Sequence, residues 1–181
     1  MQLDSKPVVK MILASFFLAL GIVLPFVTGN VAFLGSKFLP MHIPVLLCGF
    51  ICGWKYGVLV GFILPILRAT LVGMPPLFPV AFTMSFELAA YGLFAGFFYQ
   101  RLQKKTINIY ISLLLAMFVG RIVWGLVSLS LAPSVGIPFT FELFLTGAFV
   151  FALPGILFQI IFIPVMILIM RKNEVLAPYL T

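Results

Sequence analysis

Six long apolar runs make up nearly all of this chain, and short segments of glycine, proline and basic residues separate them. The first run, from Val8 to Val27, contains Lys10 as its one charged residue. A helix that crosses the hydrocarbon core of a bilayer needs about 20 apolar residues. The sequence therefore predicts an integral membrane protein whose solvent is the lipid bilayer.

Composition supports this class, because 64% of the 181 residues are hydrophobic and only 8% are charged. A soluble domain carries roughly a quarter charged residues. Six crossings with short loops account for the whole length, so we expect a single transmembrane domain over residues 1–181. Lys6 and Lys10, at the start of the first run, resemble the basic segment of a signal peptide, but no small-x-small cleavage pattern follows in a suitable position, and we expect a retained helix.

The runs are long and continuous, which favours helices over barrel strands, whose residues alternate over about ten positions. Trp54-Lys55-Tyr56, flanked by two glycines, predicts a tight turn, and three prolines in Gly73–Pro79 interrupt helical structure. The six expected helices are Val8–Val27, Met41–Gly53, Gly57–Val72, Val80–Tyr99, Ile109–Leu131 and Phe141–Met170.

Basic residues between the runs set the orientation. With the N-terminus inside, only Lys37 falls in an outer loop. The inner segments hold eight basic residues: Lys6, Lys10, Lys55, Arg101, Lys104, Lys105, Arg171 and Lys172. The positive-inside rule then places both termini in the cytoplasm. The net charge of +7 is thus a topology pattern, and no basic and aromatic stripe for nucleic acid is present.

Three ionisable residues fall inside the runs, namely Arg68, Glu87 and Arg121. Such residues are costly in lipid and usually have a function. A rise of about 1.5 Å per residue places all three at or just above the midplane, and Glu87 and Arg121 lie on consecutive helices. One interpretation is a structural ion pair, with Arg68 reaching toward the interface. The other is an outward-facing pocket whose surplus positive charge suits a carboxylate ligand.

Four further residues are candidate ligand contacts, each with an ordinary structural alternative. Trp124 lies one turn above Arg121 and either stacks on a ligand or packs as an interfacial aromatic residue. His42 opens the second helix and either contacts a ligand or caps that helix. Asn30 and Lys37, in the first outer loop, are surface residues unless that loop folds over the pocket.

Sequence patterns for other classes of protein are missing. There is no P-loop, no His-Glu-x-x-His, no Gly-x-Ser-x-Gly and no acid and histidine cluster, so we expect neither an enzyme nor a metal or other cofactor. Cys48 and Cys52 share a helix face, and we interpret them as small packing residues. No internal repeat of the kind that stand-alone secondary transporters show is evident.

Several stretches together resemble one family, the substrate-binding S-components of energy-coupling factor (ECF) transporters, which import vitamins in prokaryotes. These stretches are Ala14–Pro25, Leu39–Val45, Gly53–Gly57, Gly73–Pro79 and Phe86–Gly92. The resemblance covers essentially the whole chain. It implies an all-α bundle of six transmembrane helices, with both termini cytoplasmic, in the plasma membrane of a prokaryote.

The same resemblance implies a function. The chain would capture a small water-soluble vitamin or precursor outside and associate with a transmembrane coupling subunit and two ATPases. Ser15 and Ala19 occupy the positions of an Ala-xxx-Ala pair that faces the coupling subunit in the family, and small residues permit close approach. The family pocket, in the outer half, would include Glu87, Arg121 and Trp124. Reorientation of the whole subunit in the membrane would deliver the ligand inward.

The identity of the substrate is the least determined expectation, because S-components share a fold while differing in their pockets. The charge surplus favours a small anion such as pantothenate. Hydroxymethylpyrimidine, another thiamine precursor and a modified-base precursor remain alternatives. A structural or assembly protein without a ligand, and an intramembrane enzyme, are the competing classes.

Overall fold

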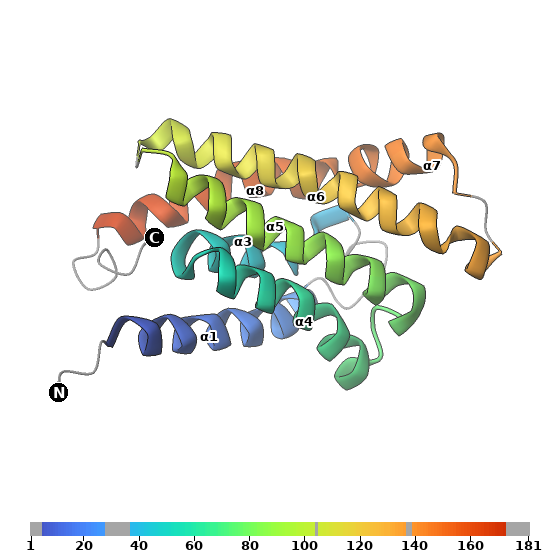
Figure 1. Ribbon diagram of the computed structural model, residues 1–181, viewed down its shortest axis with the longest axis horizontal. Helices are drawn as coiled ribbons and strands as arrows, with labels where there is room; N and C mark the ends of the chain where they lie inside the picture. The colour runs from blue at the N-terminus through green and yellow to red at the C-terminus, as the bar shows by residue number, and fades with distance from the viewer. Residues whose placement is uncertain (1–4, 28–36, 104, 137–138, 173–181) are drawn as a thin grey trace.

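In the computed structural model the described residues, which are 5–27, 37–103, 105–136 and 139–172, form helices and contain no strand. Figure 1 shows an elongated bundle with the helices running roughly along its length. The α-helices are α1 Ser5–Val27, α3 His42–Cys52, α4 Trp54–Val72, α5 Phe82–Arg101, α6 Thr106–Val135, α7 Phe141–Leu145 and α8 Leu153–Lys172. Two short segments, η1 Leu77–Ala81 and η2 Thr146–Val150, precede α5 and α8. Segment η1 is kinked at Phe78, whose backbone is extended (φ -124°, ψ 134°). The predicted all-α architecture is confirmed.

Five helical segments of the described chain are long and apolar enough to cross a membrane. They are Pro7–Phe26, Trp54–Val72, Leu77–Arg101, Thr106–Ser134 and Leu153–Lys172. The second predicted helix, α3, has only 11 residues, and each of them is buried. At about 1.5 Å per residue it covers roughly half of a bilayer core. Contacts with α1, α4, α5 and α8 surround it, so protein replaces lipid around α3.

Two of the predicted boundaries are wrong. Residues 54–56 form the first turn of α4 and are no separate loop, because Gly53 alone, at φ 98°, reverses the chain after α3. The last predicted helix, Phe141–Met170, is divided into α7, η2 and α8 by a turn at residues 151–152. Pro154 and Gly155 follow this turn directly at the start of α8, a pattern that the prediction from the apolar run did not use.

Glycines bring the backbones of α3, α4 and α5 into direct contact. A Cβ atom on Gly92 of α5 would lie 2.2 Å from the Gly57 oxygen of α4. One on Gly49 of α3 would lie 2.6 Å from the Gly92 oxygen. Small residues permit this close approach, from which packing in lipid draws much of its stability. The three helices thus form a rigid unit that fixes the position of α5.

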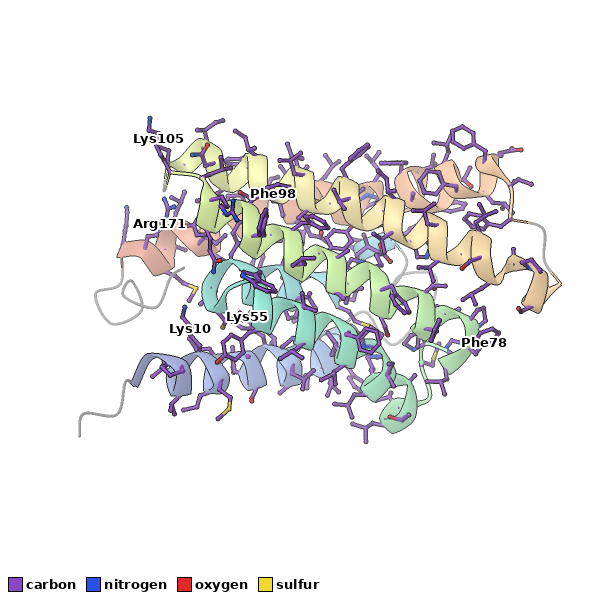
Figure 2. All side chains as sticks on the ribbon, viewed as in Figure 1. Lys10, Lys55, Phe78, Phe98, Lys105 and Arg171 are labelled. Atoms are coloured by element: carbon purple, nitrogen blue, oxygen red, sulfur yellow. The ribbon has the colours of Figure 1, made fainter. Side chains whose placement is uncertain are left out.

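Basic side chains gather at one end of the bundle. Figure 2 shows Lys10, Lys55, Lys105 and Arg171 toward the end at which α1 begins and α8 finishes, whereas Phe78 lies toward the other end. This distribution agrees with the predicted orientation, in which both termini face the cytoplasm.

Candidate functional site

Three buried ionisable side chains from three helices meet inside the bundle. Arg121 of α6 places Nη1 2.8 Å from Oε1 of Glu87 on α5. Nε2 of His42, at the start of α3, lies 3.4 Å from the same oxygen. All three side chains are at most 6% exposed. The structure therefore contains the Glu87–Arg121 ion pair that the sequence predicts, and adds His42 to it.

Tyr91 extends this cluster and was missed from the sequence. It lies one helical turn after Glu87 on α5, and its ring meets the His42 ring edge-on at 5.1 Å. Gly120 of α6 makes room for it, because a Cβ atom there would lie 2.6 Å from the Tyr91 ring. The spacing of four residues from Glu87 was the available sequence pattern, since such residues share a helix face. We call His42, Glu87, Tyr91 and Arg121 the polar cluster.

Much of the hydrogen-bonding capacity of the polar cluster is unused by the described residues. Nε and Nη2 of Arg121 are buried and have no hydrogen-bond partner there, and the same holds for Nδ1 of His42 and the Tyr91 hydroxyl. Buried polar groups normally have a partner, and an unsatisfied one costs about 1–3 kcal/mol. The free Nε–Nη2 edge of a guanidinium matches a carboxylate bidentately. The polar cluster therefore contains several buried polar atoms whose hydrogen-bonding capacity the described residues leave unused.

The chain segment that leads into His42 is held by α8. The carbonyl oxygen of Leu39 accepts hydrogen bonds from the His42 N–H at 3.0 Å and from Nε2 of Gln159 at 3.4 Å. Gly155, one turn earlier on α8, packs so closely that a Cβ atom would lie 2.6 Å from the Lys37 oxygen. The Lys37 residue, whose backbone oxygen makes this contact, is partly exposed. Gln159 was also missed, because a single glutamine in an apolar run has no periodic pattern.

Arg68 occupies a different position from the ion pair. Its Nε donates to the Ile22 oxygen of α1 at 3.4 Å, and its Nη1 donates to the Met74 oxygen. The guanidinium also lies over the Phe26 ring, 5.4 Å from its centroid. These contacts join the outer ends of α1 and α4, whereas Arg121 pairs with Glu87 between α5 and α6. A similar predicted depth for Arg68 and Arg121 therefore did not say which of them faces Glu87.

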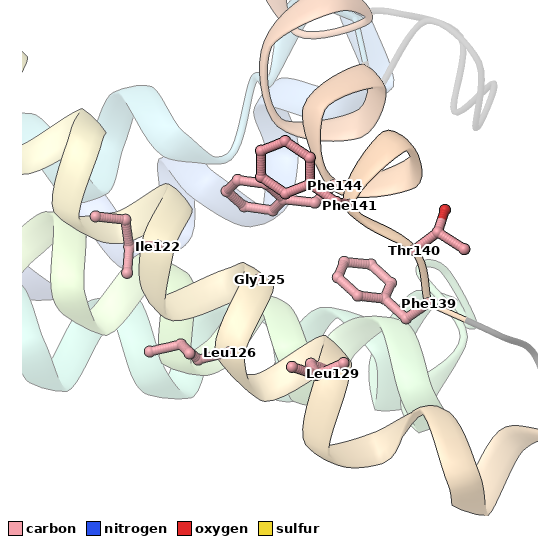
Figure 3. Close-up of a pocket in the computed structure, with 8 residues that line it drawn as sticks. All are labelled: Ile122, Gly125, Leu126, Leu129, Phe139, Thr140, Phe141 and Phe144. Atoms are coloured by element: carbon pink, nitrogen blue, oxygen red, sulfur yellow. The ribbon is translucent and has the colours of Figure 1, made fainter.

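Trp124 belongs to an aromatic cluster between α6 and α7. Its ring stacks on Phe144 at 6.2 Å and meets Phe139 edge-on at 5.7 Å. A pocket of about 340 Å³ lies beside these rings, as Figure 3 shows. Its lining residues are Ile122, Gly125, Leu126, Leu129, Phe139, Thr140, Phe141 and Phe144. This lining is almost entirely apolar, unlike the polar cluster.

The remaining predicted contacts lie elsewhere. Ser15 and Ala19 are exposed on α1, beside the exposed side chains of Ile12, Phe16 and Val23. Asn30 lies outside the described residues. No group of three or more histidine, cysteine or acidic side chains able to hold a metal occurs in the described part of the chain.

The sequence of this chain matches one known protein family. The sequence model of one family, described as "ECF transporter, substrate-specific component", matches residues 9–168. No curated protein and no solved structure shows a significant match. The match spans the five membrane-crossing segments, apart from the first two residues of Pro7–Phe26 and the last four of Leu153–Lys172, together with α3 and the polar cluster. The chain therefore belongs to the family of substrate-specific components of ECF transporters.

Proposed function

We propose that this substrate-binding subunit captures a small vitamin or vitamin precursor that bears a carboxylate, such as pantothenate, and that Arg121 holds the carboxylate. The observation that carries the proposal is the buried Nε–Nη2 edge of Arg121, to which no described residue makes a hydrogen bond of normal geometry, although the Tyr91 phenol interacts with the guanidinium. Glu87 occupies Nη1 and thereby keeps the guanidinium plane in place. A ligand carboxylate would complete the fork with two parallel hydrogen bonds.

The charges of the polar cluster leave hydrogen bonding as the main attraction for a ligand. Arg121 and Glu87 neutralise each other, and His42 lies against the same Glu87 oxygen. The surplus positive charge expected from the sequence included Arg68, which instead contacts the Ile22 and Met74 carbonyl oxygens. Burial strengthens these interactions, because buried charges attract more strongly than exposed ones.

Delivery requires partners, and we propose a transmembrane coupling subunit with two ATPases. The support on this chain is the exposed face of α1, where Ser15 and Ala19 form a shallow strip between large apolar side chains. The Ser15 hydroxyl donates a hydrogen bond to the Met11 oxygen at 3.0 Å, so this hydroxyl keeps its partner when another helix covers the face. Close helix contact at such a strip is favourable in lipid.

Titration of the purified chain with pantothenate tests the ligand assignment, read by calorimetry and by the shift in unfolding temperature. Arg121→Lys keeps the charge but loses the fork, and we expect affinity to fall at least about tenfold. Arg121→Gln alone leaves Glu87 buried without its partner, so it is compared with the Arg121→Gln/Glu87→Gln double variant. Arg101→Gln, at the exposed cytoplasmic end, is the control and keeps full affinity.

Mass spectrometry of small molecules released from the unfolded protein gives an independent answer. A carboxylate-bearing compound supports the assignment. A released compound without any acidic group, combined with unchanged affinity in Arg121→Lys, would contradict the role given to Arg121.

A further inference from the structure

On the basis of the proposed function, we infer that Gln159 is a further ligand-binding residue. Its amide carbonyl accepts a hydrogen bond from a hydroxyl group of the same carboxylate-bearing solute. The solute is thereby narrowed to hydroxy acids.

The orientation of the Gln159 amide follows from its one hydrogen bond. Nε2 lies 3.4 Å from the Leu39 oxygen, which can only accept, so the nitrogen must face Leu39. Oε1 then points away from Leu39, and it has no hydrogen-bond partner among the described residues. The side chain is fully buried, at 0% exposed. Gln159 thus presents a fixed acceptor in the interior of the bundle.

Gln159 lies at the same depth as the ion pair. It comes 13 residues before Lys172, the last residue of α8. Glu87 comes 14 residues before the end of α5, and Arg121 follows the start of α6 by 15 residues. At about 1.5 Å per residue, all three lie roughly 20–22 Å from the cytoplasmic ends of their helices.

A continuous set of contacts also joins Gln159 to the polar cluster. Gln159 and the His42 N–H share the Leu39 oxygen, and the His42 ring lies 3.4 Å from Glu87. His42 in turn contacts Tyr91, edge to ring. The same small region therefore offers guanidinium donors from α6 and an amide acceptor from α8, which together fit a solute with a carboxylate and a separate donor.

A purely structural role for Gln159 makes a different prediction. Holding the segment before α3 needs only the amide nitrogen, and Gly155 already packs against that segment. Loss of a structural contact would lower stability and would weaken all ligands alike. Loss of a ligand acceptor changes the preference between ligands, because a ligand without the donor leaves the buried carbonyl unpaired.

The experiment measures that preference with two probes, pantothenate and its analogue in which both hydroxyls are replaced by hydrogen. We expect wild type to bind pantothenate at least about tenfold more tightly than the dideoxy analogue. Gln159→Met, of similar volume and without the acceptor, should bind both with nearly equal affinity. Gln159→Leu serves the same purpose if the methionine variant is not recovered folded. Gln159→Glu has the same shape as glutamine when neutral and keeps an acceptor, so it should restore the preference for pantothenate over the analogue.

Ser112→Ala is the matched control. Ser112 is likewise fully buried with an unpartnered hydroxyl, but it lies only six residues after the start of α6. Its substitution should leave the preference unchanged. A wild-type preference retained in Gln159→Met would overturn the inference while leaving the carboxylate assignment intact. Failure of wild type to bind either probe would overturn the proposed substrate class, and this inference with it.

Discussion

At the scale of single residues, the polar cluster contains two kinds of groups, those that pair with each other and those without a hydrogen-bond partner. Glu87 receives both Arg121 and His42, while the outer edge of Arg121 and the Tyr91 hydroxyl have no partner among the described residues. A buried ion pair is only weakly stabilising in itself, since desolvation offsets much of the attraction. Its presence is therefore better explained by orientation of Arg121 than by stability.

The hydroxyl of Tyr91 provides a test at this scale. Tyr91→Phe keeps the ring that packs against Gly120 and His42, so the unfolding temperature should change little. If the hydroxyl contacts the ligand, affinity for pantothenate falls about three- to tenfold. Calorimetric titration measures the change, with Tyr110→Phe, on the cytoplasmic half of α6, as the control. An unaltered affinity would remove Tyr91 from the site.

The residues also show how far the sequence could lead. The sequence offered two basic partners for Glu87 at similar depth, Arg68 and Arg121, and only the packing of the helices selects Arg121. The addition of His42 required knowing that α3 is short and buried, so that its first residue lies deep in the bundle. Tyr91 shares a helix face with Glu87, a spacing that the sequence shows, whereas Gln159 became visible only through its unpaired carbonyl.

At the scale of elements, the contact between α4 and α5 depends on the absence of side chains. A Cβ atom on Gly92 would meet backbone atoms of Gly57 that cannot rotate away. Gly92→Ala should therefore lower the unfolding temperature strongly, by overpacking that costs roughly 1–3 kcal/mol or more. Gly147→Ala is the control, because its added Cβ would meet only the Trp124 side chain at 3.0 Å. Equal stability of both variants would show that the two helices can separate without cost.

The exposed strip on α1 predicts a second result at this scale. Ser15→Leu/Ala19→Leu should abolish co-purification with the coupling subunit, because bulky side chains keep helix backbones apart. Pantothenate affinity should be retained, since neither residue contacts the polar cluster. Ser130→Leu, exposed on α6, provides the matched control and keeps the complex. Intact assembly in the double variant would place the interface on another face.

Glycine and proline marked the end of α4 but not every boundary. Helix α4 ends at Val72, as predicted, and Gly73 follows it in the left-handed conformation. The glycines on either side of residues 54–56 suggested a turn where α4 in fact begins. The division before α8 lies beside Pro154 and Gly155, inside a run that was predicted as one helix from its apolar character alone.

At the scale of the whole molecule, the clearest prediction concerns orientation. Lys105→Cys should react with a membrane-impermeant maleimide only from the cytoplasmic side, and Phe78→Cys only from outside. Cys48 and Cys52 are buried in α3 and should react little with the maleimide. Labelling of the chain without an introduced cysteine measures this background. Labelling of both introduced cysteines from the same side would contradict the proposed topology.

The shortness of α3 has a consequence for how the protein is made. An 11-residue segment is too short to partition into lipid as an independent span, since insertion of a helix needs about 20 apolar residues. Gly53 joins it directly to α4, so the two segments form a hairpin of which only one arm is long enough to hold its place in the bilayer. During biogenesis we therefore expect α3 to remain at the membrane surface or beside the insertion machinery until α1, α4 and α5 are present to enclose it.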